Sequence, residues 1–124
     1  LTGRIDYKEK ASVITRAFYN NVKSSPSAYS QLMNGIIFLY SESVEIVVVG
    51  KKENADTIEI LKTLHGLFLP NKVILLKEGN ELDEIAPFTK ERKMEKGKTT
   101  IYVCKNYSCN SPVNTIDEML HLIK

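Results

Sequence analysis

VEIVVVG, the run from Val44 to Gly50, is rich in β-branched residues and ends at a glycine. Apolar side chains fall on both of its faces, which is the pattern of a strand covered on both sides in a parallel sheet. Two further runs resemble it, KVILL at 72–76 and TTIYVC at 99–104. Helical patterns follow the strands, and such alternation predicts right-handed parallel crossovers. We therefore expect an α/β fold with a small three-stranded parallel sheet and flanking helices.

The helices expected around this sheet follow from capping residues and apolar spacing. Asn54 can cap a helix after the first strand, and Thr115 with Glu118 forms a capping box before the last helix. The polar connection 78–98 is expected to contain a short helical turn near Leu82–Ile85. Apolar residues at helical spacing are expected to face the core: Ile58, Leu61, Leu64 and Phe68 in the first helix, and Ile116, Met119, Leu120 and Ile123 in the last.

The amino-terminal residues show a different pattern, that of two amphipathic helices in succession. Proline at the first helical position loses no needed amide hydrogen bond, so Ser25 and Pro26 mark the start of the second helix. The two apolar stripes comprise Tyr7, Ala11, Ile14, Phe18 and Val22, then Ala28, Leu32, Ile36 and Leu39. We predict a helical hairpin over residues 1–42 and a separate α/β domain over residues 43–124. No other predicted element covers the hairpin stripes.

Composition and charge exclude several classes of protein. The 124 residues are 43% apolar and 26% charged, which is typical of one soluble globular domain. A formal net charge of +2 is too small to imply nucleic acid as a partner, and the basic segment TKERKMEKGK at 89–98 is interleaved with glutamates, which favours a solvated loop. No apolar run approaches the ~20 residues that span a bilayer, so we expect no membrane partner. Two cysteines form no secreted disulfide framework, and we expect a reducing, cytoplasmic location.

The carboxyl ends of parallel strands are where α/β proteins usually bind ligands. In this chain that edge is predicted to carry Gly50 and Lys51 after the first strand, and Cys104, Asn106 and Cys109 after the third. The residues after Gly50 lack both the dinucleotide fingerprint and the ending of a phosphate-binding loop. We also find no nucleophile triad and no paired carboxylates. The sequence therefore predicts a candidate ligand edge, but no catalytic residue and no cofactor.

Cys104 and Cys109 allow several interpretations, of which packing as free thiols is favoured. A disulfide comes second, and a metal or redox centre comes third. Zinc needs four ligands, whereas the histidines, His65 and His121, lie on separate predicted helices. A redox pair normally has two intervening residues at a helix start, but here four residues follow a strand. We therefore predict no metal ligand.

Several stretches taken together resemble the carboxyl-terminal end of the YyaL family, the spermatogenesis-associated, thioredoxin-domain-containing proteins. They are LTG, YKEKA, SPSAYSQLMNGI, EIVVVG, LFLPNKVILL and, above all, YVCKNYSCNSPV, in the right order over essentially the whole chain. The resemblance implies that a thioredoxin-like domain and an α/α barrel of the six-hairpin glycosidase type precede this segment. It further implies that residues 1–42 are the last helix pair of the barrel. The missing amino-terminal domains of the same polypeptide are then the partners of the chain, and the start at Leu1 fits that expectation.

We accordingly predict a non-catalytic, accessory carboxyl-terminal segment of a YyaL-like protein, acting as a scaffold. The alternative from a different class is a ligand, zinc or thiol-redox site around Cys104 and Cys109. A third hypothesis, taken from the resemblance, is a carbohydrate-active parent enzyme whose sugar pocket is lined by Tyr29, Gln31 or Asn34.

Overall fold

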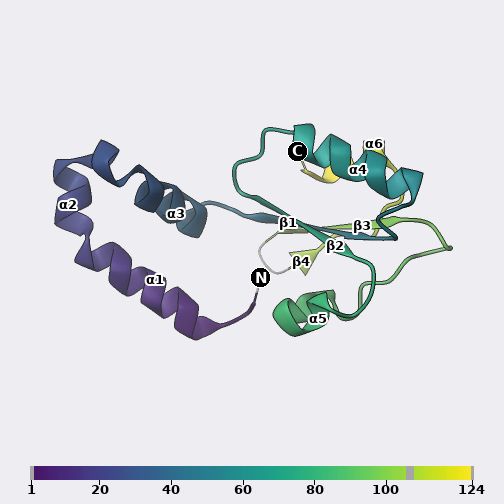
Figure 1. The fold of residues 1–124 in the computed structure, drawn as a ribbon, viewed down its shortest axis with the longest axis horizontal. Helices are drawn as coiled ribbons and strands as arrows, with labels where there is room; N and C mark the ends of the chain where they lie inside the picture. Colours follow the sequence, from purple (N-terminus) through teal and green to yellow (C-terminus); the bar gives the residue numbers. More distant parts are fainter. Residues whose placement is uncertain (1, 106–107, 124) are drawn as a thin grey trace. The chain divides into compact units, whose positions relative to one another are not determined.

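The structure, a computed structural model, describes residues 2–105 and 108–123. The described chain divides into two compact units, one from Gly3 to Glu42 and one from Ser43 onward. Figure 1 shows helices alone in the first unit, and a sheet with helices in the second. The predicted α/β class is therefore confirmed.

The first unit consists of short helices in succession. Its elements are α1 (Ile5–Ala17), α2 (Tyr19–Ser24), the 3-10 helix η1 (Pro26–Tyr29) and α3 (Ser30–Tyr40). Phe18 separates α1 from α2, so the first predicted helix is interrupted. Pro26 occupies the first position of η1, as the sequence predicts, because its missing amide hydrogen is not needed there.

Burial is low throughout this helical unit. Among the described residues, none in α1, α2, η1 or α3 is buried. The apolar stripes of α1 and α3 instead line a common groove of about 330 Å³. The ring centroids of Phe18 and Tyr29 lie 6.1 Å apart, and Ile5, Val13 and Tyr40 are largely exposed. The unit thus has no enclosed core of its own.

The second unit is built on one mixed sheet. Its strands are β1 (Val44–Val49), β2 (Lys72–Lys77), β3 (Thr100–Lys105) and β4 (Ser108–Cys109). In the described part of the chain they are ordered β2-β1-β3-β4. β1 and β2 are parallel, but β3 runs antiparallel to β1, and β4 runs antiparallel to β3. The prediction of an all-parallel sheet of three strands is therefore wrong in detail.

The connection between β2 and β3 explains the reversed strand. β1 and β2 are joined through α4 (Ala55–Gly66), which spans the sheet and lets them run parallel. The only helices in the described connection 78–99 are α5 (Leu82–Ile85) and the 3-10 helix η2 (Pro87–Thr89). In this described stretch no long helix carries the chain back to the end of the sheet where β1 and β2 begin. β3 therefore starts at the end of the sheet where β2 ends. The short turn predicted at Leu82–Ile85 is confirmed.

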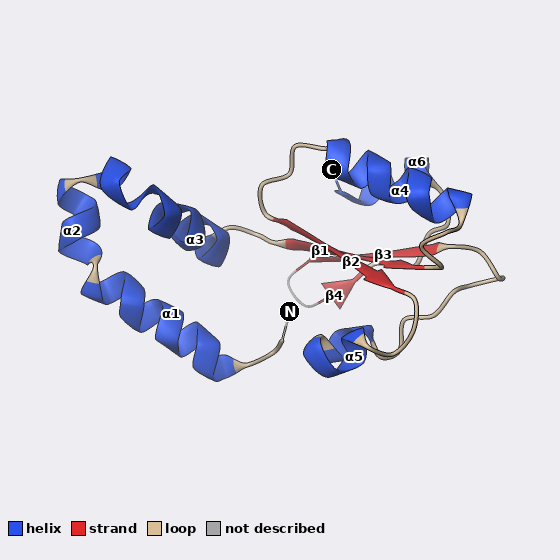
Figure 2. Cartoon of the chain, viewed as in Figure 1, coloured by secondary structure: helices blue, strands red, loops and turns tan. Residues whose placement is uncertain are grey.

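Helices cover the two faces of the sheet unequally (Figure 2). α4 and α6 (Ile116–Ile123) pack on one face, and α5 lies on the other. The first face carries the main core of Ile46, Val48, Ile60, Leu64, Ile101, Val103, Met119 and Ile123. The second face has a smaller buried cluster of Val47, Val49, Tyr102 and Cys104, against which Leu75, Phe88 and Cys109 pack.

The flanking helices differ from the prediction in their buried positions. In α4 the buried residues are Thr57, Ile60 and Leu64, so the expected burial of Leu64 is confirmed. Ile58 and Phe68 are 53% and 92% exposed, and their predicted place in the core is wrong. Phe68 lies beyond the end of α4, where the helical spacing no longer applies. The capping box before α6 is confirmed, since Glu118 N donates to Thr115 Oγ1 at 3.3 Å and Thr115 Oγ1 donates to Glu118 Oε2 at 2.6 Å.

Candidate functional site

The reversed direction of β3 separates the residues of the predicted ligand edge. Gly50 follows the carboxyl end of β1, whereas Cys104 pairs with Glu45 near the amino end of that strand. Six residues of β-strand span about 20 Å, so Gly50 and Lys51 lie far from the two cysteines. The structure does bring Cys104 and Cys109 together, as a directly opposed pair on β3 and β4. Asn106, the fifth predicted residue, falls outside the described residues.

Gly50 has a packing role at its own edge of the sheet. A Cβ atom built on this glycine would lie 2.7 Å from Thr57 Oγ1 and 2.9 Å from Thr99 Oγ1. These two buried hydroxyl groups share a hydrogen bond of 2.9 Å. Lys51, the next residue, is exposed. The glycine is therefore required because α4 and the start of β3 approach the backbone closely.

Cys104 and Cys109 form a disulfide. The preferred interpretation as free thiols is thus contradicted, because the hairpin of β3 and β4 places the two residues opposite each other. Cys104 is 2% exposed, whereas Cys109 is only partly buried at the sheet edge. Cys104 therefore belongs to the smaller core cluster, and Cys109, which packs against that cluster, is the less buried cysteine of the pair.

As a structural crosslink this disulfide closes little of the chain. The cysteines are separated by 5 positions, and they lie in a hairpin that already has backbone pairing. The chain-entropy estimate for so short a loop is about 2 kcal/mol, against ~3 kcal/mol for a loop of 15 residues. The bond joins no elements that are distant in sequence. Stabilisation alone is therefore a weak reason for a disulfide at this place.

Arg92 contacts the disulfide from the connection between β2 and β3. Its Nη2 atom donates a hydrogen bond to Cys109 Sγ at 3.3 Å. Its Cζ atom lies 5.2 Å from the centroid of the Tyr102 ring, within reach of a cation–π interaction. Its Nε atom is buried and has no hydrogen-bond partner among the described residues. A guanidinium group with spare donor capacity thus stands beside the sulfur of Cys109, the less buried of the two cysteines.

Two sets of hydrogen bonds fix the position of Arg92. The Tyr102 hydroxyl donates to Lys93 O at 2.7 Å and accepts from Lys93 N at 3.3 Å, which ties the connection to β3. Arg92 N donates to Thr89 O at 2.9 Å, so the arginine continues directly from η2. The sequence favours a solvated loop for this segment, and no local signal marks Arg92, because its partners come from β3 and β4.

A largely buried ion pair anchors the same connection to β2. Lys77 Nζ lies 2.6 Å from Asp83 Oδ1 and donates to Thr89 O at 2.7 Å. Thr89 Oγ1 in turn donates to Asp83 Oδ1 at 2.7 Å. The hydrogen bond from Lys77 is the largest cause that lowers the pKa of the Asp83 carboxyl below its ordinary value, and the hydrogen bond from Thr89 is the second. These contacts hold α5 and η2 in place, and through them Arg92.

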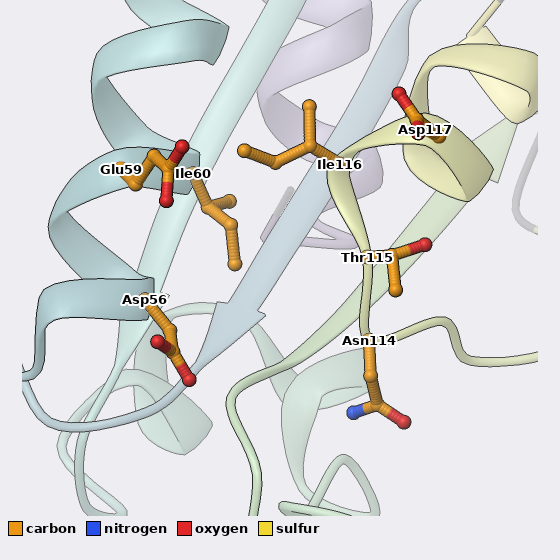
Figure 3. Close-up of a pocket in the computed structure, with 7 residues that line it drawn as sticks. All are labelled: Asp56, Glu59, Ile60, Asn114, Thr115, Ile116 and Asp117. Atoms are coloured by element: carbon orange, nitrogen blue, oxygen red, sulfur yellow. The ribbon is translucent and has the colours of Figure 1, made fainter.

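An open pocket of about 440 Å³ lies between the first turns of α4 and α6 (Figure 3). The prediction from sequence did not include it. Its polar lining carries the carboxylates of Asp56, Glu59 and Asp117, which disfavour an anionic ligand. The Asn114 amide is already engaged, because its Nδ2 atom donates to Thr99 O and Thr100 Oγ1 at 2.9 and 3.0 Å. The Asn114 amide nitrogen is therefore not free to bind a ligand in this pocket.

The remaining predictions concern metals, membranes and sugars. In the part of the chain that the structure describes, no group of three or more His, Cys, Asp or Glu side chains could hold a metal ion. No described helix has the length and apolar character needed to cross a bilayer. Tyr29 packs against the ring of Phe18, whereas Gln31 and Asn34 are exposed on α3.

Comparison with known proteins identifies similar chains of much greater length. The chain is 26% identical to human spermatogenesis-associated protein 20 over 98% of its own length. It is 25% identical to the rat and mouse proteins of that name, over 99% and 98% of its length. In each case it spans only 16% of the relative. No protein-family profile and no solved structure matches it. The chain thus resembles a segment of spermatogenesis-associated protein 20, which confirms the resemblance inferred from its motifs.

Proposed function

We propose that this chain is a non-catalytic accessory segment of a larger polypeptide, in which residues 3–42 pack against helices from other parts of that polypeptide. The observation that carries the proposal is the missing core of the helical unit. None of its described residues is buried, although residues 24–41 contain no charged side chain. Such a composition is typical of a helix covered on several sides. The small share of the relatives that the chain spans supports the same proposal.

The groove between α1 and α3 is the surface to be covered. It is lined almost entirely by apolar atoms of Ala11, Ile14, Thr15, Leu32, Gly35, Ile36, Phe38 and Leu39. Gly35 has no heavy atom within 4 Å of the position of a Cβ, which leaves room for a close helix contact. Burial of this apolar surface stabilises association by roughly 25 cal/mol per Å². An additional helix laid along the groove supplies that burial.

The resemblance to the YyaL family defines the proposed partner more closely. On this proposal the covering helices belong to an α/α barrel of the six-hairpin glycosidase type, and residues 1–42 are its last helix pair. A thioredoxin-like domain precedes the barrel in the same polypeptide, and the protein acts in the cytoplasm. We also propose that the second unit, from Ser43 onward, is a self-contained α/β domain, and the buried clusters on both faces of its sheet support this.

Hydrogen exchange on the chain alone, and on the longer polypeptide, tests this proposal. In the chain alone we expect fast exchange of the amides of α1 and α3, and slow exchange in β1 and β3. In the longer polypeptide the amides of α3 should become protected by at least about tenfold, because helices now cover them. Equal and strong protection of α3 in both proteins would refute the proposal.

A pair of charge insertions separates the groove from ordinary surface. Ile36→Asp places a carboxylate in the groove, and it should destabilise the longer polypeptide by about 3 kcal/mol because the charge becomes buried there. Ile58→Asp on the exposed face of α4 is the matched control and should change stability by less than ~0.5 kcal/mol. In the chain alone, Ile36→Asp should be as mild as the control. An equal effect of the two substitutions in the longer polypeptide would contradict the assignment of the groove.

A further inference from the structure

The disulfide of Cys104 and Cys109 has an asymmetric environment. Cys104 is buried among the residues of the smaller core cluster, and Cys109 is partly exposed. The Arg92 guanidinium donates to Cys109 Sγ at 3.3 Å. A cation beside a sulfur stabilises the thiolate that forms when a disulfide is reduced, and the thiolate is the nucleophile in thiol exchange. The sulfur of the less buried cysteine is therefore also the one that is electrostatically prepared for negative charge.

We propose that Cys104 and Cys109 form a reversible dithiol–disulfide couple that exchanges electrons with an external dithiol, with Cys109 as the nucleophile and Cys104 as the resolving thiol. Arg92 is a positioning residue in this site, because it acts by stabilising the Cys109 thiolate. The site is independent of the groove between α1 and α3, since all of its residues belong to the second unit.

The other charged groups near the pair support this division of roles. Glu45 stands directly opposite Cys104 in the register of β1 and β3, so the two side chains share one face of the sheet. A carboxylate on that face disfavours a negative charge on Cys104. The Lys105 ammonium contacts Ile123 O at 3.5 Å, at the end of α6. Arg92 thus remains the cation in contact with a sulfur among the described residues.

Reduction proceeds in two displacements. A thiolate of the dithiol attacks Cys109 Sγ, a mixed disulfide forms there, and Cys104 leaves as a thiolate that takes up a proton. The second thiolate of the dithiol then attacks the other dithiol sulfur, the one that is bonded to Cys109 in the mixed disulfide. Cys109 leaves as a thiolate beside Arg92. The dithiol loses two electrons and becomes a cyclic disulfide, and the protein gains them. One of the two thiol protons remains on Cys104, and the other is released to solvent.

A redox titration of the whole chain tests the couple. The protein is equilibrated without denaturant at fixed ratios of reduced to oxidised dithiothreitol, quenched in acid, alkylated and analysed by mass spectrometry. We expect full, reversible conversion between the disulfide and the dithiol. Arg92→Gln should shift the equilibrium constant toward the disulfide by about tenfold, because a charge-assisted hydrogen bond to the thiolate is lost. Arg92→Lys should restore most of the shift because it keeps the positive charge.

The matched control is Lys93→Gln, which removes the same charge from an adjacent, exposed side chain and keeps the backbone bonds to Tyr102. It should leave the equilibrium constant unchanged. The roles of the two sulfurs are tested by trapping with 5,5′-dithiobis(2-nitrobenzoic acid): Cys104→Ser should form a mixed disulfide at Cys109 at least about tenfold faster than Cys109→Ser does at Cys104. A disulfide that is reduced only in denaturant, two thiols that stay free under oxidised dithiothreitol, or equal shifts for Arg92→Gln and Lys93→Gln would each overturn the proposal.

Discussion

Gly50→Ala is expected to destabilise the second unit because no space exists for the added methyl group. The new Cβ would stand 2.7 Å from Thr57 Oγ1 and 2.9 Å from Thr99 Oγ1, closer than side-chain atoms ordinarily approach. The glycine cannot retreat easily, since its amide donates to Lys77 O at 3.1 Å. One of the two threonines must therefore move, and their mutual hydrogen bond of 2.9 Å is lost or lengthened.

The size of the effect follows from two costs and one gain. Overpacking of a well-packed site costs about 1–3 kcal/mol, and weakening the buried hydroxyl pair adds about 1 kcal/mol. Alanine restricts the unfolded chain more than glycine does, and this stabilises the folded state by about 0.4–1 kcal/mol. The net expectation is a loss of about 2 kcal/mol in the free energy of unfolding. With an m-value of about 1.5 kcal/mol/M, the urea midpoint should fall by about 1.3 M.

Urea unfolding followed by far-ultraviolet circular dichroism measures this change. Gly66→Ala is the matched control, because no heavy atom lies within 4 Å of its Cβ position at the end of α4. Its midpoint should stay the same or rise. In a Thr57→Ala background Gly50→Ala should cost about 1 kcal/mol less, since one of the opposing hydroxyl groups is absent. If Gly50→Ala has the midpoint of the unsubstituted protein, the packing explanation for this glycine is wrong.

Three further substitutions follow from the second unit. Leu64→Ala should lower the free energy of unfolding by about 3 kcal/mol, because it opens a cavity in the main core. The urea midpoint measures this loss, and a loss under ~1 kcal/mol would contradict the assigned burial. Phe68→Ser should change that free energy by less than ~0.5 kcal/mol in the same assay, since the ring is 92% exposed; a large loss would show that the ring is buried after all. The pKa of Asp83 is lowered in the folded state, chiefly by Lys77, so its contribution to stability is present above its ordinary value of 3.8 and is lost as pH falls through the folded pKa. Asp83→Asn should therefore lower the midpoint near neutral pH, with a difference from the unsubstituted protein that shrinks as the pH is lowered below 3.8; a difference that stays constant on acidification would contradict the pairing.

Local patterns predict the elements of the second unit but not the direction of one strand. The runs that become β1, β2 and β3 are β-branched and apolar, and this composition indicates strands whatever their neighbours are. Direction depends instead on the connection between strands. A crossover that returns along a strand of about 20 Å needs roughly 13 helical residues, and the described connection 78–99 offers only α5 and η2. The length of the predicted helical turn at Leu82–Ile85 was therefore the available signal for a reversed β3.

The sequence predicts the part of the candidate site whose residues are close together in the chain, and it misses the contacts between distant segments. Cys104 and Cys109 stand close in the chain, and the structure places Cys104 near the end of β3 and Cys109 on the adjacent strand β4. The grouping with Gly50 fails because it assumes a parallel β3. Arg92 contacts Cys109 across 17 positions, and this contact exists only after the connection folds back onto Tyr102. Local periodicity contains no information about such a contact, since it depends on strand register and on the buried pair of Lys77 and Asp83.

On our proposal for the cysteine pair, the disulfide must open without unfolding the second unit, and the position of the main core supports this. The main core lies on the face of the sheet that α4 and α6 cover, whereas the sulfurs belong to the opposite face. The backbone pairing of Lys105 with Ser108 and the hydrogen bond from Asn110 N to Val103 O at 2.9 Å do not involve the sulfurs, so we expect them to keep β3 and β4 together after reduction. The two thiols then remain side by side and can close again. The crosslink contributes only about 2 kcal/mol by the entropy estimate. A unit whose main core lies on the other face of the sheet can lose that contribution and stay folded, and a reversible couple requires this.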